Sequence, residues 1–213
     1  MGDYSPYDDK YSTDGYYYGK RASKLSNRIV ELVKPSTEKP PWLLDLGCGE
    51  GRDAVYLAGQ GFRVIGVDTS AVGLAKMARY ARDAETQVTG IHCDMAAYKL
   101  DRIYDVILSI GALHYVAPQT RRSLFERCKQ YTAEDGLNAF SVFIEKPFLP
   151  PAPDPQSTGT LFRSGELMSH YWDWEIVWCE ERIVRCQSGG ISHQHAICDM
   201  IARKLAFTDT KPC

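Results

Sequence analysis

Three glycines alternate with other residues directly after a short apolar run, in the segment LLDLGCGEGRD of residues 43–53. Glycine accepts positive φ and lets a ligand approach the backbone, so Gly47, Gly49 and Gly51 suit a binding loop. The dinucleotide fingerprint G-x-G-x-x-G and the Gly-Lys-Ser/Thr ending of the phosphate loop are both missing. Asp45 precedes the loop and two more acids lie around the start of the next helix, where they would repel a pyrophosphate. The loop therefore favours a ligand with a cationic end and no phosphate.

Two more acidic residues lie where the next two expected strands end. Asp68 closes VIGVD, about twenty residues after the glycine loop, where a carboxylate can accept both ribose hydroxyls. Asp94, in the segment HCDM, can accept from an exocyclic amine, and Met95 can cover a base. These three groups of residues match the three parts of S-adenosylmethionine, which are a charged methionine, a ribose and an adenine.

Strand and helix patterns alternate along the chain at lengths typical of a parallel sheet covered on both faces. The last two strands are joined by only a few residues and must be antiparallel to each other. We therefore predict an α/β fold: a doubly wound, seven-stranded, mostly parallel sheet with an antiparallel strand near the C-terminal edge. The expected strands cover residues 42–46, 63–68, 88–93, 104–113, 136–144, 174–185 and 192–204, and the expected helices 21–34, 52–61, 70–83, 118–131 and 164–172.

One domain is expected over residues 1–213. The predicted parts are an N-terminal lid and helix at 1–35, a cofactor-binding core at 40–145, a proline-rich loop at 146–163, and a substrate-side helix with closing strands at 164–205. The loop has too many prolines for a helix or a ladder, and long loops of this kind are often binding lids.

The motifs LDLGCGEGRD, GVDTS, HCDM and YDVILSIGALHY resemble those of class I S-adenosylmethionine-dependent methyltransferases, in order and spacing, over about residues 40–145. The segments LFRSGELMSHYWDWE and AICDMIARK resemble the small tellurite-resistance (TehB-like) branch of that class. The resemblance implies a Rossmann-like methyltransferase fold, S-adenosyl-L-methionine as cofactor and S-adenosyl-L-homocysteine as product. It also implies transfer of a methyl group to a small molecule, such as a chalcogen oxyanion, a thiol or a small anionic metabolite.

The resemblance also implies which residues bind the cofactor. The acid and glycines of the loop would surround the methionine, Asp68 would bind the ribose, and Asp94 with Met95 would lie at the adenine. Tyr18 stands where relatives often have a tryptophan before a glycine, and it could instead pack under the first helix. The full expected set is Tyr18, Asp45, Gly47, Gly49, Gly51, Asp68, Thr69, Asp94, Met95 and Ile110.

Three residues are candidates for the acceptor end. His114 follows the fourth strand and could orient a nucleophile or take its proton. His195 opens the final strand with His193 on the same face, and Arg163 could bind an oxyanion. Each of these residues could instead have no catalytic role. The histidines could belong to a polar rim of the sheet, and the arginine could be a solvent-exposed loop residue. A metal held by the two histidines and Cys198 is disfavoured, because Cys198 faces the other side of the strand; no metal ligands are predicted.

The composition of the chain limits the kinds of partner that it is expected to bind. The 213 residues carry a formal charge of −2, which gives no basic excess for nucleic acid or an anionic membrane. No apolar run approaches the roughly 18–20 residues that span a bilayer, and the polar N-terminus is unlike a secretory signal. The seven cysteines form no C-x-x-C pair. We expect a cytoplasmic monomer or homodimer that acts on a small molecule. Two rivals stay open: a nicotinamide-dependent oxidoreductase on a related fold, and a non-catalytic S-adenosylmethionine-binding partner protein.

Overall fold

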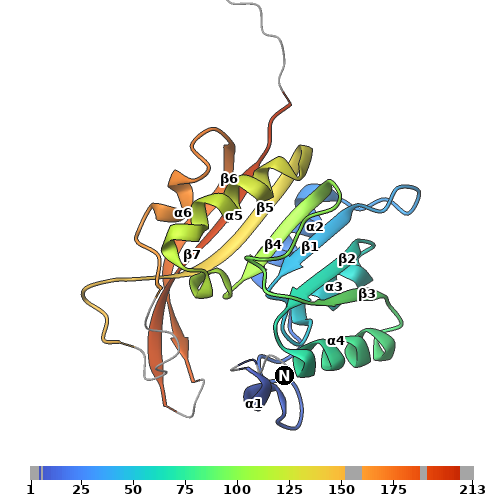
Figure 1. Cartoon of the computed structure of the whole chain (residues 1–213), viewed down its shortest axis with the longest axis horizontal. Helices are drawn as coiled ribbons and strands as arrows, with labels where there is room; N and C mark the ends of the chain where they lie inside the picture. The colour runs from blue at the N-terminus through green and yellow to red at the C-terminus, as the bar shows by residue number, and fades with distance from the viewer. Residues whose placement is uncertain (1–4, 6, 152–159, 188–190, 207–213) are drawn as a thin grey trace, which may run out of the picture.

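The computed structural model describes residues 5, 7–151, 160–187 and 191–206. Within them, strands form one seven-stranded sheet in the order β3-β2-β1-β4-β5-β7-β6 (Figure 1). The bounds are β1 Trp42–Leu46, β2 Arg63–Asp68, β3 Val88–His92, β4 Tyr104–Ile110, β5 Thr132–Ile144, β6 Glu175–Cys186 and β7 His193–Arg203.

Strand direction follows the sequence prediction. Strands β1 to β5 pair in parallel, and β7 pairs antiparallel with both β5 and β6. The single reversed strand therefore lies one place in from the sheet edge. The predicted α/β fold with an antiparallel strand near the C-terminal edge is confirmed.

Helices cover both faces of the sheet, as a doubly wound fold requires. Helices α2 (Lys24–Val33), α3 (Arg52–Gly59) and α4 (Ala71–Asp83) pack on one face, while α5 (Pro118–Gln130) and α6 (Glu166–Ser169) pack on the other. Ser23 and Ser70 begin α2 and α4, because each side-chain oxygen accepts a backbone N–H in the first turn. Among the described helices, none has the length and apolar character needed to cross a bilayer.

Several elements differ in extent from their prediction; strand β4, for example, ends at Ile110, three residues before the expected end. The helix expected at 164–172 is only the four residues of α6, since Gly165 has φ +77° and the chain turns again from His170. Strand β5 begins at Thr132, four residues before the expected start, because Thr132 pairs with Tyr104 ahead of a register shift. Of the proline-rich loop, residues 152–159 lie outside the described residues.

The carboxyl ends of the parallel strands lie at the same end of the molecule, and two other segments of the chain lie beyond them. One is the N-terminal segment with the short helix α1 (Asp8–Tyr11), which contacts α4 (Figure 1). The other is the end of the β6–β7 hairpin, since β5 stops at Ile144 opposite Ala196 while β6 and β7 continue to pair as far as Cys186 and His193. The two segments thus flank the place where open α/β sheets bind ligands.

Candidate active site

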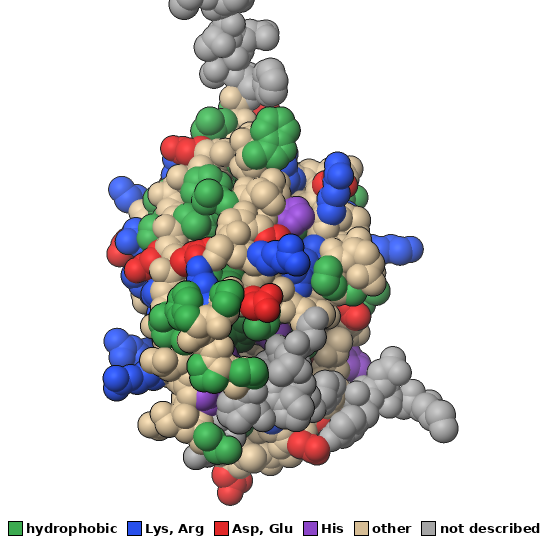
Figure 2. Space-filling view, turned by 90° about the vertical axis from the view of Figure 1, so that its left-hand side faces the viewer, with side chains coloured by type: hydrophobic (Ala, Val, Ile, Leu, Met, Phe, Trp, Pro, Cys, Tyr) green, Lys and Arg blue, Asp and Glu red, His purple; other side chains and the backbone are tan. Residues whose placement is uncertain are grey.

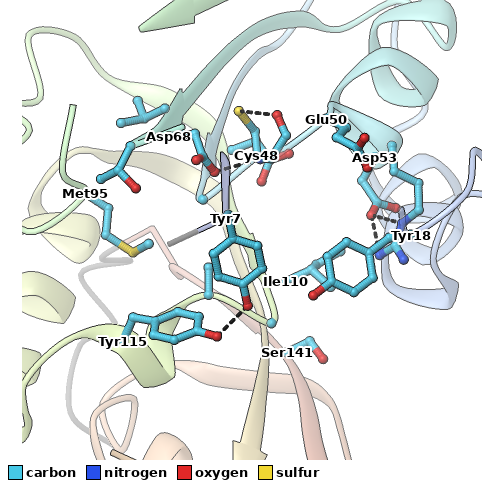
Figure 3. Close-up of a pocket in the computed structure, with 18 of the residues that line it drawn as sticks. Tyr7, Tyr18, Cys48, Glu50, Asp53, Asp68, Met95, Ile110, Tyr115 and Ser141 are labelled. Carbon is cyan, nitrogen blue, oxygen red and sulfur yellow. Dashed lines mark hydrogen bonds and ion pairs between the residues drawn. The ribbon is translucent and has the colours of Figure 1, made fainter. Parts of the chain in front are cut away.

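A cavity of about 480 Å³ lies at this end of the sheet (Figure 3). Its volume falls within the range of about 300–1,000 Å³ that is usual for small-molecule sites. Its walls come from the N-terminal segment, the glycine loop, the ends of β2, β4 and β5, and the β6–β7 hairpin. Among the expected cofactor residues, those that line it are Tyr18, Asp45, Gly47, Gly49, Asp68, Thr69, Asp94, Met95 and Ile110.

Gly51 is the expected cofactor residue that does not line the cavity. Its φ is +81°, and a Cβ added there would lie 2.2 Å from Cγ of Met77 in α4. Glycine at this position therefore lets α3 start close against α4. Gly49 has a different reason to be glycine, since a Cβ there would lie 2.6 Å from the hydroxyl of Tyr11.

Asp68 ties the glycine loop to the next helix. Its Oδ2 accepts from the backbone N–H of Gly49 at 2.7 Å, and its Oδ1 accepts from that of Ser70 at 2.8 Å. Burial raises the pKa of Asp68, and these backbone hydrogen bonds work in the opposite direction. The carboxylate thus shapes the loop while it lines the cavity beside it.

Asp45 makes the end of the cavity next to the glycine loop acidic. The residue is buried, and desolvation raises the pKa of its carboxyl well above the ordinary value, with Asp53 and Asp68 adding to the rise. A group in such a setting gains most from a cation placed next to it. The electrostatics here therefore suit a ligand with an ammonium group.

Glu50 and Lys76 hold the N-terminal segment over the cavity. Glu50 Oε2 accepts from the N–H of Tyr17 at 2.7 Å, and Oε1 pairs with Lys76 Nζ at 2.7 Å. Lys76 Nζ also donates to the carbonyl oxygens of Tyr11 at 2.8 Å and Thr13 at 3.0 Å. Glu50 is one of the two acids that the sequence analysis expected to repel a pyrophosphate, whereas in the structure it anchors the N-terminal segment.

Asp53 has a similar structural task at the start of α2. It accepts from the N–H of Ser23 and the hydroxyl of Ser26, and it pairs with Arg52 at 2.7 Å. Both acids near the helix start are therefore bound to neighbouring chain segments. Asp45 also lines the cavity, and it is the aspartate whose pKa burial raises well above the ordinary value.

Tyrosine side chains cover the cavity on the side of the N-terminal segment. Tyr7 donates to or accepts from the hydroxyl of Tyr115, and Tyr18 points into the same space (Figure 3). Sequence reasoning missed Tyr7 and Tyr115. Tyr7 and Tyr11 lie four residues apart in the segment YDDKY, which is the spacing of one helix face, and this spacing was the available signal.

Met95 and Ile110 line the cavity as expected (Figure 3). Asp94 also lines it and accepts from the N–H of Ala96 at 2.7 Å. This hydrogen bond fixes one carboxylate oxygen, so the second oxygen is the one that can meet an exocyclic amine.

The two candidate histidines, His114 and His195, pack against Phe143. His114 is buried, with its ring 4.8 Å from that of Phe143, and the ring of His195 lies 4.7 Å from that of Phe143. Phe143 lines the cavity, while neither histidine does. Burial, together with the nearby charges of Arg121 and His195, lowers the pKa of His114 to about 3, so His114 is neutral at physiological pH.

Arg163 is not brought to the cavity wall in this structure. Its side chain is exposed, and its backbone N–H donates to Glu166 Oε2 at 2.8 Å. The buried guanidinium nearby belongs to Arg121, which pairs with Glu166 Oε1 at 2.6 Å. Sequence reasoning also missed the remaining acceptor-side lining, whose members share no motif: Tyr115, Ser141, Phe143 and Val184.

Comparison with known proteins matches the chain to one family. The family model described as "Tellurite resistance protein TehB" matches residues 7–190. The "Probable S-adenosyl-L-methionine-dependent methyltransferase TehB" of Haemophilus influenzae is 24% identical over 193 residues, which cover 88% of this chain and 66% of the relative. The chain thus spans slightly less than two thirds of that relative's length.

Solved structures agree on the fold. The crystal structure of TehB from Haemophilus influenzae superposes with a TM-score of 0.75 at 23% identity, covering 93% of this chain and 65% of that one. A 1,6-didemethyltoxoflavin-N1-methyltransferase from Burkholderia thailandensis, crystallised with 1,6-didemethyltoxoflavin and S-adenosylhomocysteine, gives 0.64 at 22% identity, covering 85% and 77%. The family predicted from the motifs is confirmed: the chain belongs to the TehB family of class I methyltransferases.

Proposed function

We propose that the chain transfers a methyl group from S-adenosyl-L-methionine to a small molecule. The observation that carries the proposal is the buried Asp45 at the base of a glycine loop, in a cavity of about 480 Å³. S-adenosyl-L-methionine supplies a methyl group already activated on a sulfonium. The name of the Haemophilus influenzae relative and the S-adenosylhomocysteine in the Burkholderia thailandensis structure support the same cofactor.

The residues of the cavity fit that cofactor without a phosphate site. Asp45 would bind the ammonium, and the backbone around Gly47 and Gly49 would accept the close approach of the methionine. Asp68 would accept from the ribose hydroxyls, and Asp94 from the adenine amine. Alignment and exclusion of water would then do most of the catalytic work.

The acceptor would lie between the tyrosines of the N-terminal segment and the end of β5. Tyr115, Ser141 and Phe143 form this part of the wall. In this proposal His114 is a positioning residue that acts through Phe143 and Tyr115, since its ring lies 4.0 Å from that of Tyr115. The proposal keeps His195 near the acceptor, while a role for Arg163 in holding an anion stays a prediction. A chalcogen oxyanion, a thiol or a small anionic metabolite would fit a cavity of this size.

Calorimetry tests the cofactor. S-adenosylhomocysteine should bind with a micromolar dissociation constant, about −8 kcal/mol, while NAD should not bind. Asp68→Ala should weaken the affinity by about 1.5–3 kcal/mol, the usual loss for hydrogen bonds to a charged group. Binding of NAD in place of S-adenosylhomocysteine would support the oxidoreductase rival.

Turnover tests the reaction. Incubation of the protein with S-adenosylmethionine and a panel of thiols, selenite and tellurite should yield a methylated product. S-adenosylhomocysteine binding without any product across the panel would support the rival of a non-catalytic binding protein.

A further inference from the structure

The end of the β6–β7 hairpin gathers a thiol and two imidazoles. Cys186 pairs across the hairpin with His193, and the next pair on the same face is Val184 with His195. All three side chains of the set Cys186, His193 and His195 are half-buried, and one nitrogen or sulfur atom from each lies within 4.8 Å of the others.

The two imidazoles face each other through the nitrogens that usually bind metals. His193 Nε2 and His195 Nε2 lie 2.8 Å apart. Tetrahedral zinc, with bonds of about 2.0–2.3 Å, places its ligand atoms about 3.4–3.6 Å apart. The nitrogens therefore need to separate by about half an ångström, which small rotations of the two rings can supply.

A backbone carbonyl already sets the tautomer that metal binding needs. His193 Nδ1 lies 2.7 Å from the carbonyl oxygen of Ile191, so this nitrogen carries the proton and donates it. In the neutral ring Nε2 then presents a lone pair toward His195. A ring N–H that donates to a carbonyl is the usual outer support of a histidine that binds a metal.

The cluster lies on the acceptor side of the cavity. Val184 and Ile197 line the cavity, and they share the sheet face of Cys186, His193 and His195. The ring of His195 packs against Phe143, which lines the same wall. Figure 2, which views the side of the molecule that carries β6, shows histidine side chains at the surface near this end.

We propose that Cys186, His193 and His195 bind one zinc-like divalent cation, whose fourth position is open toward the acceptor end of the cavity. Two imidazole nitrogens and one thiolate are ligands that zinc prefers, and three protein ligands with one open position are typical of catalytic zinc sites. Cys198, whose participation in a metal site the sequence disfavoured, is buried in the core cluster on the other face of β7. The proposal departs from the sequence-based expectation of no metal ligands, because the pairing of Cys186 with His193 depends on the hairpin register.

The open position gives the site a use in the proposed reaction. A thiol or a related soft acceptor would bind the cation and lose its proton to solvent, which leaves the more nucleophilic anion on the acceptor side of the cavity. Binding of the cation itself releases the proton of the Cys186 thiol. This part of the inference rests on the proposed function, whereas cation binding does not.

Cobalt(II) titration of the metal-free full chain tests the site. Wild type should bind one equivalent with a thiolate-to-cobalt charge-transfer band and the strong visible bands of tetrahedral cobalt, and zinc should displace it. Cys186→Ala should lose the charge-transfer band, and His195→Ala should weaken binding at least about tenfold. Cys179→Ala, an exposed cysteine on the same strand, should behave as wild type.

Three outcomes separate the parts of the inference. Equal titrations of wild type and Cys186→Ala, with matching circular dichroism, would overturn the site. A wild-type cobalt spectrum that does not change with added mercaptoethanol would overturn the open position. Calorimetry with S-adenosylhomocysteine on the same samples keeps the cofactor proposal distinct, since that affinity should be the same in wild type and in all three variants.

Discussion

Replacement of Lys76 should release the N-terminal segment from the cavity. The ammonium of Lys76 makes three polar contacts: an ion pair with Glu50 and hydrogen bonds to the carbonyls of Tyr11 and Thr13. The side chains of Lys76 and Glu50 are only 12% and 4% exposed, so water replaces these contacts poorly. Lys76→Met keeps the length of the side chain and removes all three contacts.

The expected magnitude follows from these contacts. Hydrogen bonds to charged groups contribute about 1.5–3 kcal/mol each, and loss of one partner of a buried ion pair costs about 3–5 kcal/mol. The three contacts share one ammonium, so we expect about 3 kcal/mol in total for the closing of the segment, or about a hundredfold in the population of the open form. If the cofactor needs the closed form, its apparent affinity should fall about ten- to a hundredfold.

Hydrogen exchange and calorimetry measure the two effects. Amides of residues 7–19 should exchange faster in Lys76→Met, while those of β1 and β4 keep their protection, and S-adenosylhomocysteine should bind more weakly. Arg79→Met is the matched control, because Arg79 is an exposed cation one turn further along α4. Wild-type exchange in the segment together with wild-type affinity in Lys76→Met would refute the anchoring role of Lys76.

Two further substitutions test the glycine loop and the buried acid. Gly51→Ala should destabilise the fold by about 2–5 kcal/mol in urea denaturation, since positive φ costs about 1–2 and the overlap with Met77 about 1–3; Gly59→Ala, in open space at the end of α3, should be neutral or stabilising. Asp45→Asn should stabilise the ligand-free protein and weaken S-adenosylhomocysteine binding about ten- to a hundredfold. The raised pKa of Asp45 means that the ligand-free wild type loses stability as pH rises above the ordinary carboxyl pKa, and the variant should lack this loss.

The sheet and the cofactor end could be predicted from the sequence because the signals there are local. Buried strands leave apolar runs, and each run ends beside a residue that lines the cavity, as with Asp45, Asp68 and Asp94. Parallel pairing then brings these ends to one edge of the sheet. The fold and this part of the cavity wall can therefore be predicted from short sequence segments, each taken separately.

The acceptor end could not be predicted in the same way, because its side chains meet only through long-range pairing. Cys186 and His193 face each other because β6 and β7 pair in one register, and a shift of one residue would turn the thiol to the other face. His114 follows β4 as expected, yet it packs behind Phe143 of β5, which the motif around His114 does not encode. A residue such as His114, whose side chain could act as a base, can therefore contact a residue of the cavity wall without lining the cavity itself. Only the register of the hairpin and the packing of β5 decide which of these side chains reaches the acceptor.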